Sequence, residues 1–243
     1  MSDLRAALAN ALGSLYHLER EVRPVDEYRM FVVTRVPGRA ELLVKVLPAA
    51  VSLAINADRL EHELLLLADR LRHPNLVAPR GGGRAGSFIY HTRPFIEGTT
   101  LRNWMARKGP VPLLRAVDIL RGVLGGLAHA HAGGIAHGDL RAEHVLLGVD
   151  GIHVADAGIA HLLGRTASPR DDMTALGTLV HEMLTSRPHS VHEEPLELGR
   201  ALPSWLTEWM QTRWPDAGPA LAALRPPPPP PPPSSPRASQ PFA

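Results

Sequence analysis

The sequence predicts an α+β fold in which a small antiparallel sheet precedes a larger helical lobe. Short β-rich segments separated by turn residues fill the chain up to Phe95, whereas long segments with helical periodicity dominate from Leu113 onward. Hydrophobic residues make up 44% of the 243 positions, enough for the core of one two-lobed globular unit. Strands followed by helices are typical of α+β proteins rather than of alternating α/β proteins.

The order of elements follows from periodicity and punctuation. The expected strands are Tyr16 to Val22, Tyr28 to Val36, Glu41 to Leu47 and Phe88 to Phe95, the last of which could form one strand or two. Pro37-Gly38 supplies a turn between the second and third strands. The expected helices are Asp3 to Leu12, Leu60 to Leu71, Leu113 to His131, Met173 to Thr185 and Pro203 to Arg213.

Composition excludes several classes of function. The formal charge is +2 with scattered basic residues, so no stripe is expected to bind nucleic acid. The absence of cysteine excludes disulfides and cysteine-based zinc sites. Met1 to Ser14 lacks the apolar core of a signal peptide, and no apolar run reaches the ~18 residues of a membrane span. We therefore expect a soluble cytoplasmic protein without a membrane partner.

The C-terminal segment has a composition of its own. Pro226 to Pro233 is an unbroken proline run, and such a segment lacks backbone donors and has little apolar surface to bury. We expect residues 225–243 to be a disordered proline-rich tail, which is either a spacer or a ligand for a proline-recognising domain. The expected organisation is an N-terminal helix (1–15), an N-lobe (16–95), a C-lobe (96–224) and this tail (225–243).

Six segments, taken in order, carry a family resemblance. They are LLVKVL ending at Leu47, ELLLLADRLRHPNLV with the turn His73 to Asn75, RPFIEGTTL, GIAHGDLRAEHVLL, VADAGIA and DDMTALGTLVHEMLTSRP. Together they resemble the bacterial Ser/Thr protein kinases, and the resemblance covers about Tyr16 to Leu224. The loop His137-Gly138-Asp139 is also similar to that of small-molecule phosphotransferases, an alternative that the other segments favour less.

The resemblance implies roles for particular residues. Lys45 matches the lysine that contacts the α- and β-phosphates of ATP, Asp139 the catalytic base and Asp156 the principal Mg²⁺ ligand. Each could instead be an ordinary strand or turn residue. Glu63 is the natural helix partner of Lys45, with Glu61 a weaker choice. Glu63 lies one residue farther from His73 than the family spacing expects. An extra residue in the following loop would preserve the pairing, whereas an extra residue within the helix would rotate Glu63 by ~100° and turn Leu64 inward instead.

The nucleotide-binding parts depart from the family pattern. The expected glycine-rich loop, Arg23 to Tyr28, contains no glycine, although backbone amides approach phosphates closely only where side chains are absent. Leu43 replaces the alanine above the adenine, and Arg93 stands at the gatekeeper position beside the hinge. We therefore expect a closed or misshapen nucleotide slot, with Ile96 marking the hinge backbone.

The metal site and the segment after it are changed as well. His144 replaces the asparagine that binds the second metal, although Mg²⁺ prefers oxygen ligands. Ala157 replaces the phenylalanine after the metal-binding aspartate. Too few residues lie between Gly158 and Asp172 for a phosphorylated activation loop and a peptide-docking surface. Gly138 correspondingly replaces the arginine that would pair with a loop phosphate, and Gly218 replaces the late arginine of the family.

These departures predict a pseudokinase that acts as a non-catalytic regulatory or scaffolding module with a protein partner. The first alternative is a divergent Ser/Thr protein kinase that transfers the ATP γ-phosphate to protein. The second is a switch that binds ATP without metal through Lys45 and the hinge at Ile96. ATP and Mg²⁺ are the cofactors that the resemblance implies, and we expect their binding to be weak or absent.

Overall fold

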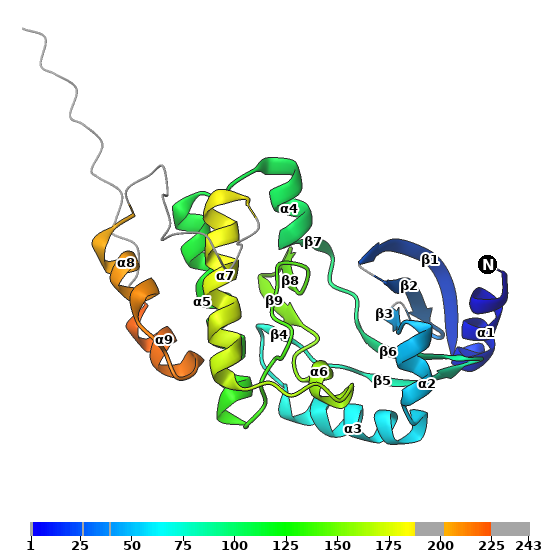
Figure 1. The fold of residues 1–243 in the computed structure, drawn as a ribbon. Coiled ribbons are helices and arrows are strands. Elements are labelled where there is room, and N and C mark those ends of the chain that lie inside the picture. Colours follow the sequence, from blue (N-terminus) through cyan, green and yellow to red (C-terminus); the bar gives the residue numbers. More distant parts are fainter. Residues whose placement is uncertain (1, 26, 39, 188–201, 225–243) are drawn as a thin grey trace, which may run out of the picture.

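The structure, a computed structural model, describes residues 2–25, 27–38, 40–187 and 202–224 (Figure 1). Within these residues a sheet lobe and a helical lobe lie side by side, as the sequence predicts. The proline-rich tail, for which we expected disorder, lies outside the described residues. In the described part of the chain, no helix is both long enough and apolar enough to cross a membrane.

The N-lobe sheet is antiparallel, with the strand order β1-β2-β3-β6-β5. Its strands are β1 (Tyr16–Val25), β2 (Tyr28–Arg35), β3 (Glu41–Val46), β5 (Gly81–Ala85) and β6 (Phe88–Pro94). Helix α1 (Ser2–Leu12) places Leu4 and Leu8 against Phe31, Val44 and Tyr90 of the sheet. The glycine-rich strand β5 was not expected, because glycine is a poor strand former; backbone pairing with β6 holds it in place.

The other face of the sheet is covered by α2 (Ala49–Ala54) and α3 (Ala57–Arg70). The side chain of Asn56 caps α3 by accepting a hydrogen bond from the Arg59 amide at 2.9 Å. Leu60, Leu64 and Leu67 form the buried stripe of this helix. This stripe fixes the rotation of α3 about its axis and thereby decides which of its side chains can reach the cleft.

The helical lobe surrounds a small second sheet with the strand order β4-β9-β8-β7. These strands are β4 (Leu76–Val77), β7 (Gly98–Thr100), β8 (Val145–Gly148) and β9 (Ile152–Ala155). The helices are α4 (Leu101–Lys108), α5 (Leu113–Ala132), α6 (Ile159–Leu162), α7 (Pro169–Thr185), α8 (Ser204–Gln211) and α9 (Ala217–Ala223). One core cluster runs from Leu47 and Leu64 through α5 to Met183 and Trp209. The buried core is therefore continuous between the lobes.

The turn at Asn75 joins the two lobes at the middle of α5. A Cβ added to Gly125 would lie 3.0 Å from the Asn75 side chain, and one added to Gly126 would lie 2.9 Å from the Asn75 carbonyl oxygen. The Asn75 amide also donates to the Ile152 carbonyl at 2.8 Å. Because Gly125 and Gly126 have no side chains, the turn at Asn75 can pack between α5 and the small sheet. This packing sets the position of α3 relative to β9.

Only a short connection joins β9 to α7 in the described structure. It consists of residues 156–168 and contains the single-turn helix α6. Ser168 and Asp171 then begin α7 with a capping box, in which the Ser168 side chain and the Asp171 carboxylate each accept the other residue's backbone amide hydrogen. The shortened activation segment expected from the sequence is therefore an ordered, capped connection.

Candidate functional site: a cleft closed by its own charges

A cavity of about 240 Å³ lies between the lobes, where β3 and β6 face β8 and the start of α4. Its volume is below the ~300–1,000 Å³ of typical small-molecule pockets. Leu43, Arg93 and Ile96 line it together with Lys45, His144 and Asp156. The structure thus brings the predicted adenine-slot, hinge and metal positions to one cavity.

Lys45 and Asp156 form a buried ion pair at the back of this cavity. The Lys45 Nζ atom donates to Asp156 Oδ2 at 2.6 Å, and the two side chains are 8% and 7% exposed. Strand β3 presents Lys45, and Asp156 follows β9 with a left-handed backbone (φ = 65°). Aspartate tolerates this conformation better than most residues. The two groups that the resemblance assigns to phosphate and metal therefore satisfy each other.

Two further cationic or titratable side chains surround the same carboxylate. Arg93 Nε lies 3.6 Å from Asp156 Oδ1, and His144 Nε2 lies 3.5 Å from Asp156 Oδ2. Burial alone would raise the pKa of Asp156, but Lys45, followed by His144, His91 and Arg93, holds it well below the usual 3.8. Asp156 is consequently ionised, and its carboxylate is paired with cationic side chains of the protein.

Tyr28 covers the lysine from the N-lobe side. Its ring lies 4.2 Å from the Lys45 Nζ atom, a cation–π contact. The expected loop from Arg23 to Tyr28 was too long, because β1 continues to Val25 and pairs there with Tyr28. Hairpin pairing thus extends into the segment where a phosphate-binding loop was expected, and it places an aromatic ring over Lys45.

The predicted partnership of Lys45 with Glu63 is wrong. Leu64 is fully buried at the inward-facing position of α3, while Glu63 borders pockets beside α2 and α6 that do not include Lys45. The additional residue between Glu63 and His73 therefore lies within α3 and not in the loop that follows it. It rotates Glu63 away from Lys45 and turns Leu64 inward. Glu61 is exposed as well, so Asp156 takes the place of a helix glutamate.

Leu43 and Arg93, the two residues expected to crowd the adenine slot, lie side by side in this cavity. Leu43 and Arg93 are cross-strand partners of β3 and β6, so their side chains project from the same face. Arg93 is 9% exposed and donates to the Pro94 carbonyl at 3.3 Å. Burial lowers its pKa, while Asp156 acts in the opposite direction. A buried guanidinium thus stands beside the hinge.

The predicted base, Asp139, remains accessible and lies between two arginines. Its carboxylate oxygens are 3.7 Å from Arg141 Nε and 3.7 Å from Arg165 Nη1, and its side chain is 29% exposed. The backbone oxygen of Asp139 accepts a hydrogen bond from His144 Nδ1 at 2.7 Å. This bond places the His144 proton on Nδ1 in the neutral ring, so its Nε2 lone pair faces Asp156.

The space between Asp139 and Asp156 is very small. A cavity of about 20 Å³ lies there, lined by both aspartates, Tyr28, His91 and His144 among other residues. Such a volume holds about one water molecule. A phosphoryl group could reach both carboxylates only if Tyr28 or α6 moved.

The donor set does not fit Mg²⁺. This cation demands near-octahedral oxygen coordination, whereas Asp156 Oδ2 is bonded to Lys45 and the neighbouring donor is an imidazole nitrogen of His144. Within the described residues, no group of three or more His, Asp or Glu side chains is arranged to hold a metal ion. We therefore assign no chemical step to a metal here.

Ala157, which stands where the family has a phenylalanine, is buried, and the segment around it is closely packed. Ala157 is 2% exposed within the main core. A Cβ added to the next residue, Gly158, would lie 3.0 Å from the Leu67 side chain and 3.1 Å from Ile135. Leu67 of α3 therefore packs closely on the short segment at Gly158.

Gly138 shows that the short segment is packed onto the loop of Asp139. Its φ is +79°, and an added Cβ would lie 3.0 Å from Ala160 and 3.2 Å from Ala167. An arginine at this position would meet both the left-handed backbone and these two methyl groups. The short segment therefore packs directly against Gly138, in space that an arginine side chain would need.

Asp172 is a key residue that the sequence reasoning did not single out. It is 1% exposed at the start of α7 and accepts the backbone amide hydrogens of His137 at 2.6 Å and Gly138 at 2.9 Å. His131 Nε2 donates to it at 2.9 Å. An aspartate beside a helix cap reads as a surface residue, so only the fold reveals that it anchors the loop of Asp139.

The chain belongs to the protein kinase domain family, whose model matches residues 33–192. It is 35% identical to the serine/threonine-protein kinase PknL of Mycobacterium tuberculosis over 141 residues, covering 48% of this chain and 35% of PknL. It is 29% identical to the serine/threonine-protein kinase PrkC of Bacillus subtilis over 145 residues, covering 49% of this chain and 22% of PrkC. The chain therefore spans about a third or less of the length of these two relatives.

The fold is similar to that of a solved kinase domain. The crystal structure of the M. tuberculosis PknI kinase domain matches with a TM-score of 0.72 at 20% identity, covering 87% of this chain and 95% of that domain. The resemblance to bacterial Ser/Thr protein kinases and the bilobal fold are thus confirmed. The family match favours this identification over the small-molecule phosphotransferase alternative.

Proposed function

We propose that this domain is a pseudokinase, a non-catalytic regulatory or scaffolding module that works by binding another protein. The observation that carries the proposal is the 2.6 Å pair between Lys45 and Asp156. In a working cleft these groups face phosphates and metal, whereas here each is the other's partner. Tyr28 and Arg93 close the pair from two further sides.

A second candidate, a divergent Ser/Thr protein kinase, has an observation of its own. Asp139 is accessible and lies on the same small cavity as Lys45 and Asp156, and the curated relatives carry kinase names. A third candidate is a metal-independent ATP switch, which would use Lys45 and the hinge at Ile96 on the larger cavity. Nucleotide binding separates these candidates.

The first prediction concerns ATP binding by the full chain. Because Leu43 and Arg93 narrow the slot and Lys45 is already paired, millimolar ATP should leave the melting temperature unchanged, with Mg²⁺, with Mn²⁺ or without metal. A ligand at 100 times its Kd would add ~2.7 kcal/mol and be readily seen. The double variant Leu43→Ala/Arg93→Met should restore a measurable shift.

The matched control is Leu42→Ala/Arg84→Met, which removes similar groups from the same sheet. Leu42 belongs to the core cluster that packs with α1, and Arg84 is an exposed residue of β5. This variant should remain unresponsive to ATP. A metal-independent shift in the unmodified chain would replace our proposal with the nucleotide switch, and a shift that requires metal would favour the divergent kinase.

The proposed role requires a protein partner, and the chain offers two regions for it. One is the face of the helical lobe beside the short connection between Asp156 and α7. The other is the proline run from Pro226 to Pro233, whose composition suits a proline-recognising domain. Deleting residues 225–243 separates the two, because only tail-dependent binding would be lost.

A further inference from the structure

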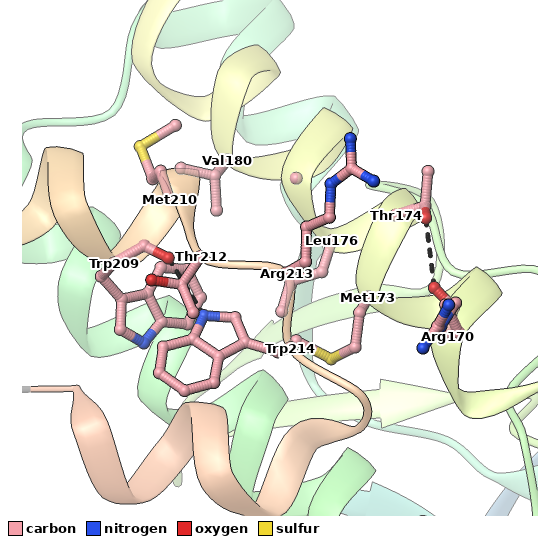
Figure 2. A pocket seen from close by; sticks show the side chains of 11 residues that line it. Arg170, Met173, Thr174, Leu176, Val180, Trp209, Met210, Thr212, Arg213 and Trp214 are labelled. Carbon is pink, nitrogen blue, oxygen red and sulfur yellow. Dashed lines mark hydrogen bonds between the residues drawn. The ribbon is translucent and has the colours of Figure 1, made fainter.

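A groove of about 430 Å³ lies between α7 and α8, away from the nucleotide cleft (Figure 2). Its apolar wall comes from Met173 and Val180 on α7, from Met210 on α8, and from Trp214 in the connection between α8 and α9. Trp214 is anchored, because its indole nitrogen donates to the Trp209 carbonyl at 3.0 Å. The groove is therefore a formed surface feature with a rigid aromatic side.

The groove lies on the side of α7 opposite to the shortened connection. Helix α6 and the residues after it pack towards α3 and Gly138, while α8 lies on the other flank of α7 (Figure 1). In the described part of the chain, nothing fills the groove. Thr174, Gly177 and Thr212 line it and are exposed to solvent.

The charge around the groove has one sign. The ionisable residues that line it are Arg170, at the start of α7, and Arg213, after α8. Both are exposed, and no carboxylate lines the groove in the described structure. The α7 end beside Arg170 also carries the positive pole of the helix dipole. An apolar floor with cationic edges is complementary to an apolar segment that bears carboxylates.

We propose that this groove binds a short amphipathic segment of a partner protein, with apolar side chains inserted between α7 and α8 and acidic side chains paired with Arg170 and Arg213. Helix-in-groove recognition uses apolar anchors one helical turn apart. Methionine adapts to varied shapes, and tryptophan and arginine are enriched at binding hot spots. Carboxylates on arginine form strong, directional hydrogen bonds.

This inference rests on the proposed interaction role, but its test uses a different measurement. Random 16-residue peptides displayed on phage are selected on the immobilised full chain, and the enriched peptides are resynthesised with a fluorophore. Fluorescence anisotropy then gives their Kd. We expect enriched sequences with apolar pairs three or four positions apart, flanked by Asp or Glu. Nucleotide binding in the cleft can fail or succeed without affecting this result.

Gly177 supplies a clean steric probe. A Cβ added to it meets nothing within 4 Å, and its backbone is helical. Gly177→Gln should fill the groove and weaken the peptides at least tenfold, whereas Gly177→Ala should leave their Kd unchanged. Both variants should fold like the parent chain, because the site is open and alanine and glutamine are better helix formers than glycine.

Charge reversal provides the second probe. Arg213→Glu and Arg170→Glu should each weaken the acidic peptides about tenfold, and replacing the acidic peptide residues with Lys should restore binding to these variants. Arg115→Glu, at an exposed position of α5, is the control and should change nothing. Such rescue by charge exchange is not expected from a merely structural role.

Three results would overturn the proposal. Selected peptides could bind independently of Gly177→Gln, or lysine-bearing peptides could bind the parent chain equally well. Alternatively, the chain could form a dimer that Gly177→Gln abolishes, in which case a second copy would be the occupant.

Discussion

Asp156 and Asp172 are both buried carboxylates, yet the structure holds them in opposite ways. Side-chain charges from separate elements, Lys45 and Arg93 among them, surround Asp156. Asp172 is held mainly by backbone amides, those of His137 and Gly138. The first arrangement involves groups that could meet a ligand, while the second is part of the architecture. The comparison shows that backbone amides hold the carboxylate that anchors the loop of Asp139, whereas side-chain charges hold the carboxylate in the cleft.

The sharpest test of this comparison is Asp172→Ala. Removing a fully buried carboxylate leaves the His137 and Gly138 amides without their acceptor, and breaking such a buried network typically costs ~3–5 kcal/mol. We expect a loss of that size in the free energy of unfolding, measured with urea. Asp171→Ala is the matched control: its exposed carboxylate makes only a capping contact with Ser168, so its loss should be clearly smaller. Equal losses would mean that Asp172 is no anchor.

Removing both partners of the Lys45–Asp156 pair should destabilise the fold less than removing Lys45 alone. Lys45→Met alone leaves Asp156 with Arg93 and His144, so we expect a loss near the lower end of ~3–5 kcal/mol. The double variant Lys45→Met/Asp156→Leu should recover to within about 1 kcal/mol of the parent chain, since apolar pairs often replace buried ion pairs. Urea unfolding of the two single variants and the double variant gives the coupling energy. A double variant that is less stable than both singles would contradict the comparison.

Buried histidines predict how stability depends on pH. Burial lowers the pKa of both His91 and His137 to about 4, from 6.5 in the unfolded chain. Between these values the unfolded state binds more protons, so stability is fully present above pH 6.5 and is lost as pH falls towards 4. At pH 5 each histidine should cost about 2 kcal/mol, on the order of 1.4 per pKa unit.

His91 allows this pH effect to be assigned. Among its described neighbours, neither of its ring nitrogens has a hydrogen-bond partner, so His91→Phe removes the titration without deleting a bond. The difference in the free energy of unfolding between pH 7.5 and pH 5, measured with urea, should shrink by about 2 kcal/mol in this variant. His17→Phe, at an exposed strand position, is the control and should retain the full pH dependence. If the pH dependence of the unfolding free energy is unchanged in His91→Phe, groups other than His91 take up the protons.

The sequence was informative where the local pattern reflects the packing. Alternation and turn residues predicted β2, β3 and β6, and the periodicity of α5 and α7 was clear. Leu43 and Arg93 were assigned to the slot from the family resemblance, and the register of β3 against β6 pairs them across the sheet. Strand β5 was not predicted, because its pairing with β6 overrides the low strand propensity of its glycines.

The errors in the site have a common physical cause. Glu63 was assigned to Lys45 from the family resemblance, although its spacing from His73 was one residue too long. The buried leucine stripe of α3 decides the rotation of the helix and turns Leu64 inward. Likewise, the loop before Tyr28 was misjudged because hairpin pairing extends to Val25. Asp172 was missed because its partners lie 34 and 35 residues away. Long-range contacts of this kind leave no local signal.

The smallest expected effect concerns Asp139, which is accessible but faces a cleft without a fitting metal site. Ordinary kinases turn over at ~1–100 per second, and loss of one positioning element typically costs ~10²–10³-fold. The glycine-rich loop and the second metal ligand are both replaced here, which predicts a loss of ~10⁴–10⁶-fold if the two act independently and somewhat less if they act as a unit. Asp139→Asn should therefore change nothing measurable in phosphoryl transfer.

The measurement is incorporation of radiolabelled phosphate from ATP into the chain itself and into generic protein acceptors, in Mg²⁺ and in Mn²⁺. The parent chain, Asp139→Asn and the exposed-site control Asp118→Asn should all match a blank without protein. Incorporation by the parent chain and by Asp118→Asn that disappears in Asp139→Asn would show a working base at Asp139. The ion pair between Lys45 and Asp156 would then have to separate during turnover. Asp156 would differ from Asp172 in being held by contacts that can break, and its role in phosphoryl transfer would be retained.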